Sequence, residues 1–128
     1  MDIYVGTDII EIERIKKVYS RKIGFLHRIF TEQEILYLKS RKFNLQNIAG
    51  LFSAKESISK VLGTGISGFS WKDIEIFYDK NHAPHVNLYN NAKLIAERKG
   101  IEVIKISISH SDNNVISFAV GYGGENIK

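Results

Sequence analysis

Asp8 is an acidic residue within a segment that otherwise has the pattern of an apolar β-strand. Its neighbours Gly6, Ile9 and Ile10 give a carboxylate no evident reason to be there. A buried charge is costly unless it is paired or bound to a metal ion. Asp8 is therefore either partly exposed at a strand end, which is the commoner case for an aspartate, or a metal ligand.

Glu56 and Lys60 are spaced to lie on one side of a helix. Glu56 follows Phe52 by four residues, at the edge of the apolar stripe, and Lys60 stands one turn further along. The ordinary interpretation is a surface Glu–Lys pair that contributes about 0.2–0.5 kcal/mol to helix stability. Nothing in the neighbouring sequence makes Glu56 a metal ligand.

Gly63, Thr64 and Gly65 can present successive backbone N–H groups to a phosphate. They follow a predicted helix C-terminus, where the helix dipole disfavours anions, so a helix cap and turn is the first interpretation. His110 continues the core-facing side of its strand. It is either a hydrogen-bonded structural histidine or a phosphate contact or base.

Arg14, Lys17, Arg21 and Arg28 recur at near-helical spacing. If the helical register continues through Gly24, they form a basic seam opposite the apolar stripe. A solvated helix face is the common explanation for such charges. A docking surface for an acidic protein is the alternative, because complementary charge raises encounter rates and fixes orientation.

These residues are placed by a predicted α+β fold, in which an antiparallel sheet packs with a long helix. Alternating apolar residues predict strands over 3–10, 73–78, 84–88, 103–109 and 115–122. The first strand is apolar on both faces, which predicts that it is well buried. Helical spacing and cap residues predict helices over 11–19, after a capping box at 31–34, over 45–62, and from Asn90 or Asn91 to Gly100.

The composition fits one domain spanning residues 1–128, without internal repeats. The chain has 0 cysteines, which excludes disulfides and cysteine-ligated metals, so a metal must sit on oxygen or histidine ligands. A net charge of +4 favours acidic partners such as phosphates, nucleic acid or an acidic protein. No apolar run reaches membrane-spanning length and the N-terminus does not have a signal-peptide pattern, so we expect a cytoplasmic protein.

Three separated segments resemble the small magnesium-dependent holo-acyl-carrier-protein synthase family of phosphopantetheinyl transferases. They are VGTDIIEIERI at 5–15, FSAKESISKVLGTGI at 52–66 and SISHS at 107–111. The resemblance implies transfer of 4'-phosphopantetheine from coenzyme A to a serine of apo acyl carrier protein, in fatty acid biosynthesis. The serine hydroxyl would attack the pantetheine-side phosphorus and release adenosine 3',5'-bisphosphate.

The resemblance also assigns roles to residues. Asp8 and Glu56 match the Mg²⁺ ligands, and together with Lys60 they are the expected catalytic residues. Two carboxylates with substrate oxygens suit a hard octahedral ion. The expected coenzyme A contacts are Lys60, Gly63, Thr64, Gly65, Pro84 and His110. Either Glu56 or a metal-bound water held by both carboxylates would accept the serine proton.

Members of the family usually form trimers with coenzyme A sites between subunits. The expected docking residues for the acidic carrier protein are Arg14, Lys17, Arg21 and Arg28. The sequence departs from the family at Leu51, where many relatives have an arginine. Arg41 or Lys42 are the candidates to supply the missing phosphate contact. Ser57 stands where alanine is more usual, and it is also small.

Two other functions compete with the transferase. One is a binding module for coenzyme A or a carrier protein that has lost catalysis, which the presence of Asp8, Glu56 and Lys60 argues against. The other is a small basic nucleic-acid-binding domain. The basic residues lack interleaved aromatic residues and no nucleic-acid motif is present, so we expect no nucleic-acid partner.

Overall fold

The computed structural model describes residues 2–21, 24–65 and 67–123, apart from the side chain of Arg21. Strand β1 is followed by four consecutive helices, a short 3₁₀ helix η1 and then two strand pairs that α5 separates. Their bounds are β1 Ile3–Glu11, α1 Ile12–Arg21, α2 Phe25–Ile29, α3 Glu32–Ser40, α4 Leu45–Leu62, η1 Trp71–Asp73, β2 Ile74–Tyr78, β3 Pro84–Leu88, α5 Asn90–Lys99, β4 Val103–His110 and β5 Asn114–Tyr122.

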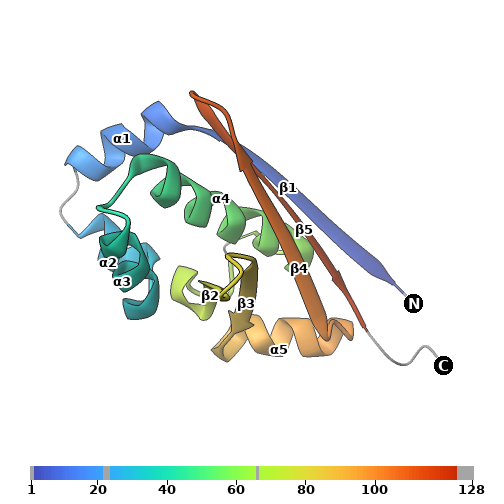
Figure 1. The fold of residues 1–128 in the computed structure, drawn as a ribbon. Helices are drawn as coiled ribbons and strands as arrows, with labels where there is room; N and C mark the ends of the chain where they lie inside the picture. The colour runs from blue at the N-terminus through green and yellow to red at the C-terminus, as the bar shows by residue number, and fades with distance from the viewer. Residues whose placement is uncertain (1, 22–23, 66, 124–128) are drawn as a thin grey trace.

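The strands confirm the predicted α+β fold with an antiparallel sheet. Three strands pair in the order β1-β5-β4, and the hairpin of β2 and β3 forms a second, two-stranded sheet. In the larger sheet, Asp8 of β1 lies opposite Ser117 of the central strand β5. The long helix α4 packs across one face of this sheet (Figure 1).

Helix α4 begins and ends where its sequence predicts. The Asn44 side chain accepts hydrogen bonds from the backbone N–H groups of Gln46 and Asn47 at the N-terminus. Gly63 ends the helix with a φ of 88°, a left-handed conformation that favours glycine. The helix contacts β1 so closely at Gly6 that a Cβ there would collide with the Ser57 carbonyl oxygen.

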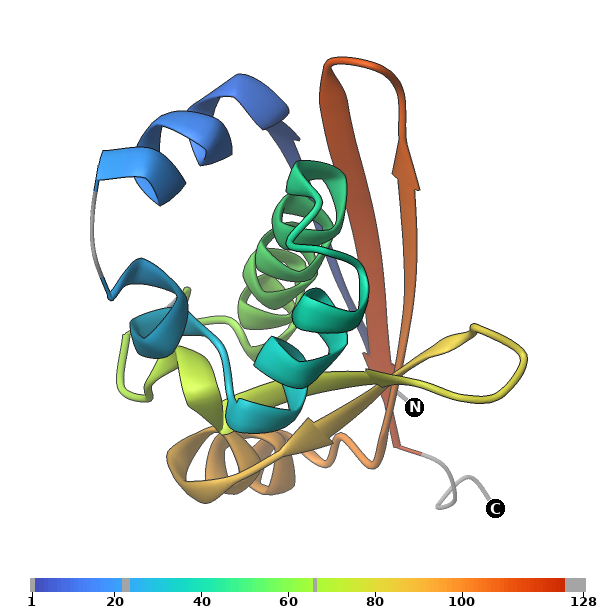
Figure 2. The same cartoon turned by 60° about the vertical axis from the view of Figure 1, so that its left-hand side comes forward.

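The outer face of the three-stranded sheet is exposed, which corrects the prediction that β1 is well buried. The exposed fractions are 62% for Ile3, 58% for Val5 and 66% for Ile9 in β1, and 48% for Ile116 and 43% for Phe118 in β5. The reason is that α4 covers the opposite face, and none of the described elements covers this one (Figures 1 and 2). An apolar sheet face is therefore left uncovered in the isolated chain.

A buried ion pair joins α3, α4 and β2. Lys55 Nζ lies 2.8 Å from Glu34 Oε1, and both side chains are fully buried. Lys55 also donates to the carbonyl oxygens of Trp71 and Ile74, and Glu34 Oε2 accepts from the Ile76 N–H at 2.8 Å. Burial raises the pKa of Glu34 and lowers that of Lys55, and each residue opposes the shift of the other.

One predicted helix end is confirmed and two differ. The capping box is confirmed, since Thr31 and Glu34 exchange side-chain to backbone hydrogen bonds. The register after α1 does not continue, because Gly24 has a φ of 89° and a separate short helix, α2, follows it. Asn90 does not cap α5. The N-cap is Tyr89, and the Asn90 amide instead donates to Asp73 Oδ1 at 3.0 Å.

Among the described helices, none combines the length and apolar character that crossing a membrane requires.

Candidate functional site

The two carboxylates singled out in the sequence line one small cavity between β1, α1 and α4. Asp8 points inward from β1 and Glu56 comes from the middle of α4, and the cavity has a volume of about 240 Å³. Arg14 of α1 and Phe52 of α4 also line it. Residues 48 positions apart in the sequence are brought together because α4 packs against the inner edge of β1.

Asp8 has a buried oxygen without a protein partner. Among the described residues, its Oδ2 atom is the one buried side-chain polar atom for which no hydrogen bond is made. A buried carboxylate oxygen needs a compensating donor or cation, since leaving it unpaired costs about 1–3 kcal/mol. None of the described residues supplies a hydrogen-bond donor to this oxygen.

Glu56 has the electrostatic environment of a cation ligand. Burial raises the pKa of its carboxyl, the negative charge of Asp8 raises it further, and Lys60 acts in the opposite direction. Two carboxylates that line one cavity repel each other unless a cation lies between them. The repulsion is built into the packing of β1 against α4.

These two carboxylates fit a hard divalent cation that keeps part of its hydration shell. Mg²⁺ binds through one or two protein carboxylates, with waters and substrate phosphates as its remaining ligands. In the part of the chain that the structure describes, no group of three or more His, Cys, Asp or Glu side chains gathers around one point. The donor set suits an ion shared with a substrate better than a closed structural metal site.

Lys60 lies beside Asp8 and Glu56, and the glycine-containing turn follows Lys60 at the end of α4. Lys60 Nζ donates to the carbonyl oxygen of Thr7 at 2.7 Å, and it lines a shallow cavity with Asp8. The turn follows directly after α4, and Gly65 has a φ of 62°. The exposed Thr64 hydroxyl donates to the Gly65 carbonyl at 2.8 Å.

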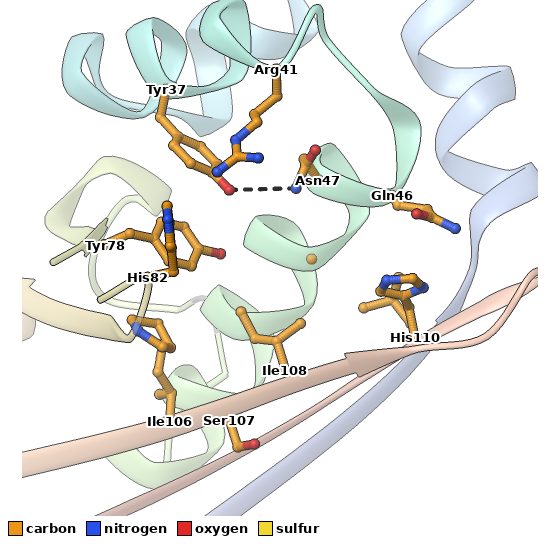
Figure 3. A pocket seen from close by; sticks show the side chains of 13 residues that line it. Tyr37, Arg41, Gln46, Asn47, Tyr78, His82, Ile106, Ser107, Ile108 and His110 are labelled. Carbon is orange, nitrogen blue, oxygen red and sulfur yellow. Dashed lines mark hydrogen bonds between the residues drawn. The ribbon is translucent and has the colours of Figure 1, made fainter. Parts of the chain in front are cut away.

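Pro84 and His110 line a different and larger pocket, with a volume of about 560 Å³. It lies between α3, the N-terminal half of α4, the β2–β3 hairpin and β4 (Figure 3). Ile108 and His110 project into it from β4, and Arg41 and Tyr37 reach into it from the end of α3.

The larger pocket combines a cation with an aromatic wall. The guanidinium of Arg41 lies 5.4 Å from the ring centre of Tyr37, and Tyr37 stacks on Tyr78 at 4.6 Å. The Asn47 amide donates to the Tyr37 hydroxyl at 3.4 Å. Burial, followed by the adjacent Tyr37, raises the pKa of Tyr78, so Tyr78 stays neutral and the positive charge of this wall comes from Arg41.

The predicted site residues therefore fall into two groups at opposite edges of the sheet. Asp8, Glu56 and Lys60 lie at the β1 edge, and Pro84 and His110 lie on the β4 side. Strand β5 separates the two edges, which places them about 10 Å or more apart. No single cavity among those described contains members of both groups.

The four basic residues proposed for docking do not form one seam. Arg14 and Lys17 are exposed on α1, and Arg14 lines the carboxylate cavity. Arg28 is exposed on α2, beyond the break at Gly24. Arg21 ends α1, and its side chain lies outside the described part of the structure.

The pocket residues Tyr37 and Tyr78 were not predicted from the sequence. No local pattern distinguishes these tyrosines from core residues, since their role depends on α3 lying against β2. Leu51 is fully buried, so this position contributes only to the core. Of the two basic residues suggested to compensate for it, Arg41 lines the larger pocket and Lys42 does not.

Comparison with known proteins places these features in a family. Residues 4–119 match the family described as the 4'-phosphopantetheinyl transferase superfamily. The chain is 59% identical over 125 residues to a holo-[acyl-carrier-protein] synthase of Thermoanaerobacter sp. strain X514, a match that covers 98% of this chain and 91% of the relative.

Solved structures share the fold over nearly the whole chain. An acyl carrier protein synthase of Plasmodium yoelii with ADP bound superposes with a TM-score of 0.87 at 32% identity, covering 98% of this chain and 100% of the other. A Helicobacter pylori holo-[acyl-carrier-protein] synthase in complex with coenzyme A gives a TM-score of 0.79 at 34% identity, covering 91% of this chain and 98% of the other.

Proposed function

Because the chain belongs to the 4'-phosphopantetheinyl transferase superfamily and is a holo-[acyl-carrier-protein] synthase, we propose that its reaction takes place at the Asp8–Glu56 cavity. The enzyme transfers 4'-phosphopantetheine from coenzyme A to acyl carrier protein. The single observation that carries the proposed location is the buried, unpartnered Asp8 Oδ2 beside a second carboxylate.

In this proposal Asp8 and Glu56 hold Mg²⁺. The ion, when bound, neutralises charge on the diphosphate and on the leaving bisphosphate. Lys60, fixed by its hydrogen bond to the Thr7 carbonyl, adds a second positive charge beside the transferred phosphoryl group. Glu56, or a water that it orients, accepts the proton of the carrier-protein serine. The Gly63–Gly65 turn lies next to Lys60 and contacts the phosphates through its backbone.

We further propose that a complete coenzyme A site needs two subunits. Pro84 and His110 of one subunit would bind the nucleotide portion of coenzyme A. The diphosphate of the same coenzyme A molecule would lie at Asp8 and Glu56 of a neighbouring subunit. The separation of the two groups in one chain supports this arrangement. The uncovered apolar face of the sheet supports self-association, since strands β1 and β5 expose large aliphatic side chains there. A homotrimer is the expected assembly.

The exposed basic residues of α1 would receive the acidic carrier protein. Arg14 lines the cavity that contains Asp8 and Glu56, so a partner bound to α1 would bring its serine close to the carboxylates. Lys17 lies one turn further on the same helix. Residues 1–128 are proposed to act as one transferase domain in the cytoplasm.

The test is intact-mass spectrometry of purified apo acyl carrier protein after incubation with this enzyme, coenzyme A and Mg²⁺. We expect the mass gain of a phosphopantetheine group, which disappears with a chelator and with Asp8→Ala. Arg14→Glu should raise the KM for the carrier and leave coenzyme A binding unchanged. Binding of coenzyme A without any mass gain, on several carriers, would instead indicate an inactive binding module.

A further inference from the structure

The Gly63–Gly65 turn occupies a position that is unfavourable for a phosphate. It follows the C-terminus of α4, where the unpaired carbonyl groups carry about half a negative charge. The Gly63 N–H pairs with the carbonyls of Ser59 and Lys60, at 3.0 Å each. The carbonyl of Leu62, the last residue of α4, is not paired by the Gly63 N–H and accepts from a separate donor.

That donor is Lys99, the last residue of α5. Its Nζ atom donates to the Leu62 carbonyl oxygen at 3.0 Å. The same ammonium lies 4.5 Å from the ring centre of Tyr4, on the inner side of β1. A Cβ built on Gly63 would come within 2.5 Å of Lys99 Nζ. The ammonium is therefore fixed directly against the turn, by contacts with α4 and β1.

The charge of Lys99 reverses the electrostatic sign at this end of α4. One full positive charge in contact with the last carbonyl outweighs about half a negative charge from the helix dipole. Lys60 lies along the same edge of β1, bonded to the carbonyl of Thr7. The ammonium group that contacts the turn is therefore that of Lys99, and a phosphate bound at the turn is attracted by it.

We propose that Lys99 is a positioning residue for the coenzyme A phosphates at the Gly63–Gly65 turn. It acts through the C-terminus of α4, by capping Leu62 and by making the local potential positive. This role rests on the proposed function, in which the turn contacts the phosphates. A lysine placed here only for packing would stabilise α4 without affecting the binding of an anionic ligand.

The experiment compares Lys99→Gln, Lys99→Met and Lys99→Arg with a matched control, Lys93→Gln, which removes an exposed charge from the same helix. Calorimetry gives the Kd for coenzyme A, and the mass assay gives KM and kcat. We expect the two uncharged variants to raise Kd and KM about three- to tenfold, with kcat within about twofold of wild type. Lys99→Arg should restore Kd to within about twofold, and the control should leave it unchanged.

Several outcomes would overturn the role of Lys99. They are an unchanged Kd in both uncharged variants, an equal rise in Lys93→Gln, or the failure of both uncharged variants to fold, which would show a structural role. The proposed function is judged separately, by whether the wild-type enzyme transfers phosphopantetheine. If it binds coenzyme A without transfer, the ratio of Kd values still decides the role of Lys99.

Discussion

At the scale of single residues, the site is defined by what Asp8 and Glu56 lack. A buried carboxylate oxygen without a donor lies beside a second carboxylate whose pKa is raised by burial and by that neighbour. Repulsion between the two carboxylates lowers the stability of the fold, which is common at functional sites. A bound cation would remove this repulsion.

The variant Glu56→Gln tests whether repulsion between Asp8 and Glu56 destabilises the fold. With chelator at pH 7, we expect the variant to exceed the wild type in unfolding free energy by about 0.5 kcal/mol, a small value because Glu56 is partly exposed. The raised pKa of Glu56 means that the native state keeps its proton at pH values where the unfolded chain has lost it. The stabilising effect of the substitution should therefore be present above that raised pKa and vanish below pH 4.5.

The same variant should lose its response to metal. Millimolar Mg²⁺ is expected to raise the Tm of the wild type, because the ion binds the folded state, and to leave the Tm of Glu56→Gln unchanged. Differential scanning calorimetry measures both effects. An equal rise in Tm for the two proteins would place the metal elsewhere.

The role of Arg41 can also be tested by a single substitution. Leu51 is fully buried, and Arg41 supplies a cation in the pocket that contains His110. We expect Arg41→Met to raise the KM for coenzyme A about tenfold, the usual effect of losing a charge-assisted hydrogen bond to phosphate. Lys42→Met is the matched control, since Lys42 does not line the pocket. Equal effects of the two substitutions would reduce the role of Arg41 to general surface charge.

At the scale of elements, the Glu34–Lys55 pair ties α4 to the hairpin side of the molecule. Lys55 precedes Glu56 on α4, and its ammonium bonds to Glu34 and to the carbonyls of residues 71 and 74. The pair therefore fixes α4 relative to α3 and β2, on opposite sides of the larger pocket.

Lys55→Met should destabilise the fold by about 3–5 kcal/mol, because it leaves the Glu34 carboxylate buried without its cation. Adding Glu34→Gln to the same chain should recover part of the loss, since the second change removes the unpaired charge. Urea denaturation followed by circular dichroism measures both. A single variant within about 1 kcal/mol of wild type would contradict the importance of the pair.

At the scale of the whole molecule, the uncovered sheet face and the two separated half-sites have one explanation. A neighbouring copy of the chain would cover the exposed sheet face, and it would supply the half-site that completes the coenzyme A site. We expect Val5→Glu, at a position 58% exposed on the outer face, to convert the proposed trimer into monomers and to abolish transfer. Leu36→Glu, on α3 and also 58% exposed, is the control and should keep the trimer. Light scattering after size-exclusion chromatography distinguishes the two.

Mixed trimers provide a sharper test of shared sites. Asp8→Asn removes one of the two proposed half-sites, and a chain with His110→Ala and Arg41→Met lacks the other. If each site combines two subunits, mixing and reassembling the two inactive proteins should restore a fraction of the activity, because some interfaces join two intact halves. Activity that stays at the level of the separate proteins would show that each subunit carries its own complete site.

The sequence by itself determined the local features of this protein. The ends of α4, the capping box at Thr31 and the strand pattern follow from residues a few positions apart, which is the range over which hydrogen bonding and periodicity act. The three segments that resemble the family also lie within single elements. Asp8 and Glu56 could be singled out from them without knowledge of the packing.

Only the tertiary structure decided how distant residues meet. The packing of α4 against β1 places Asp8 beside Glu56, and α5 brings Lys99 to the end of α4. The apolar pattern of β1 does not reveal which face a helix covers, so the pattern predicts burial for a side that is exposed. Burial depends on what packs against each surface, and these contacts join residues whose sequence separation no local pattern specifies.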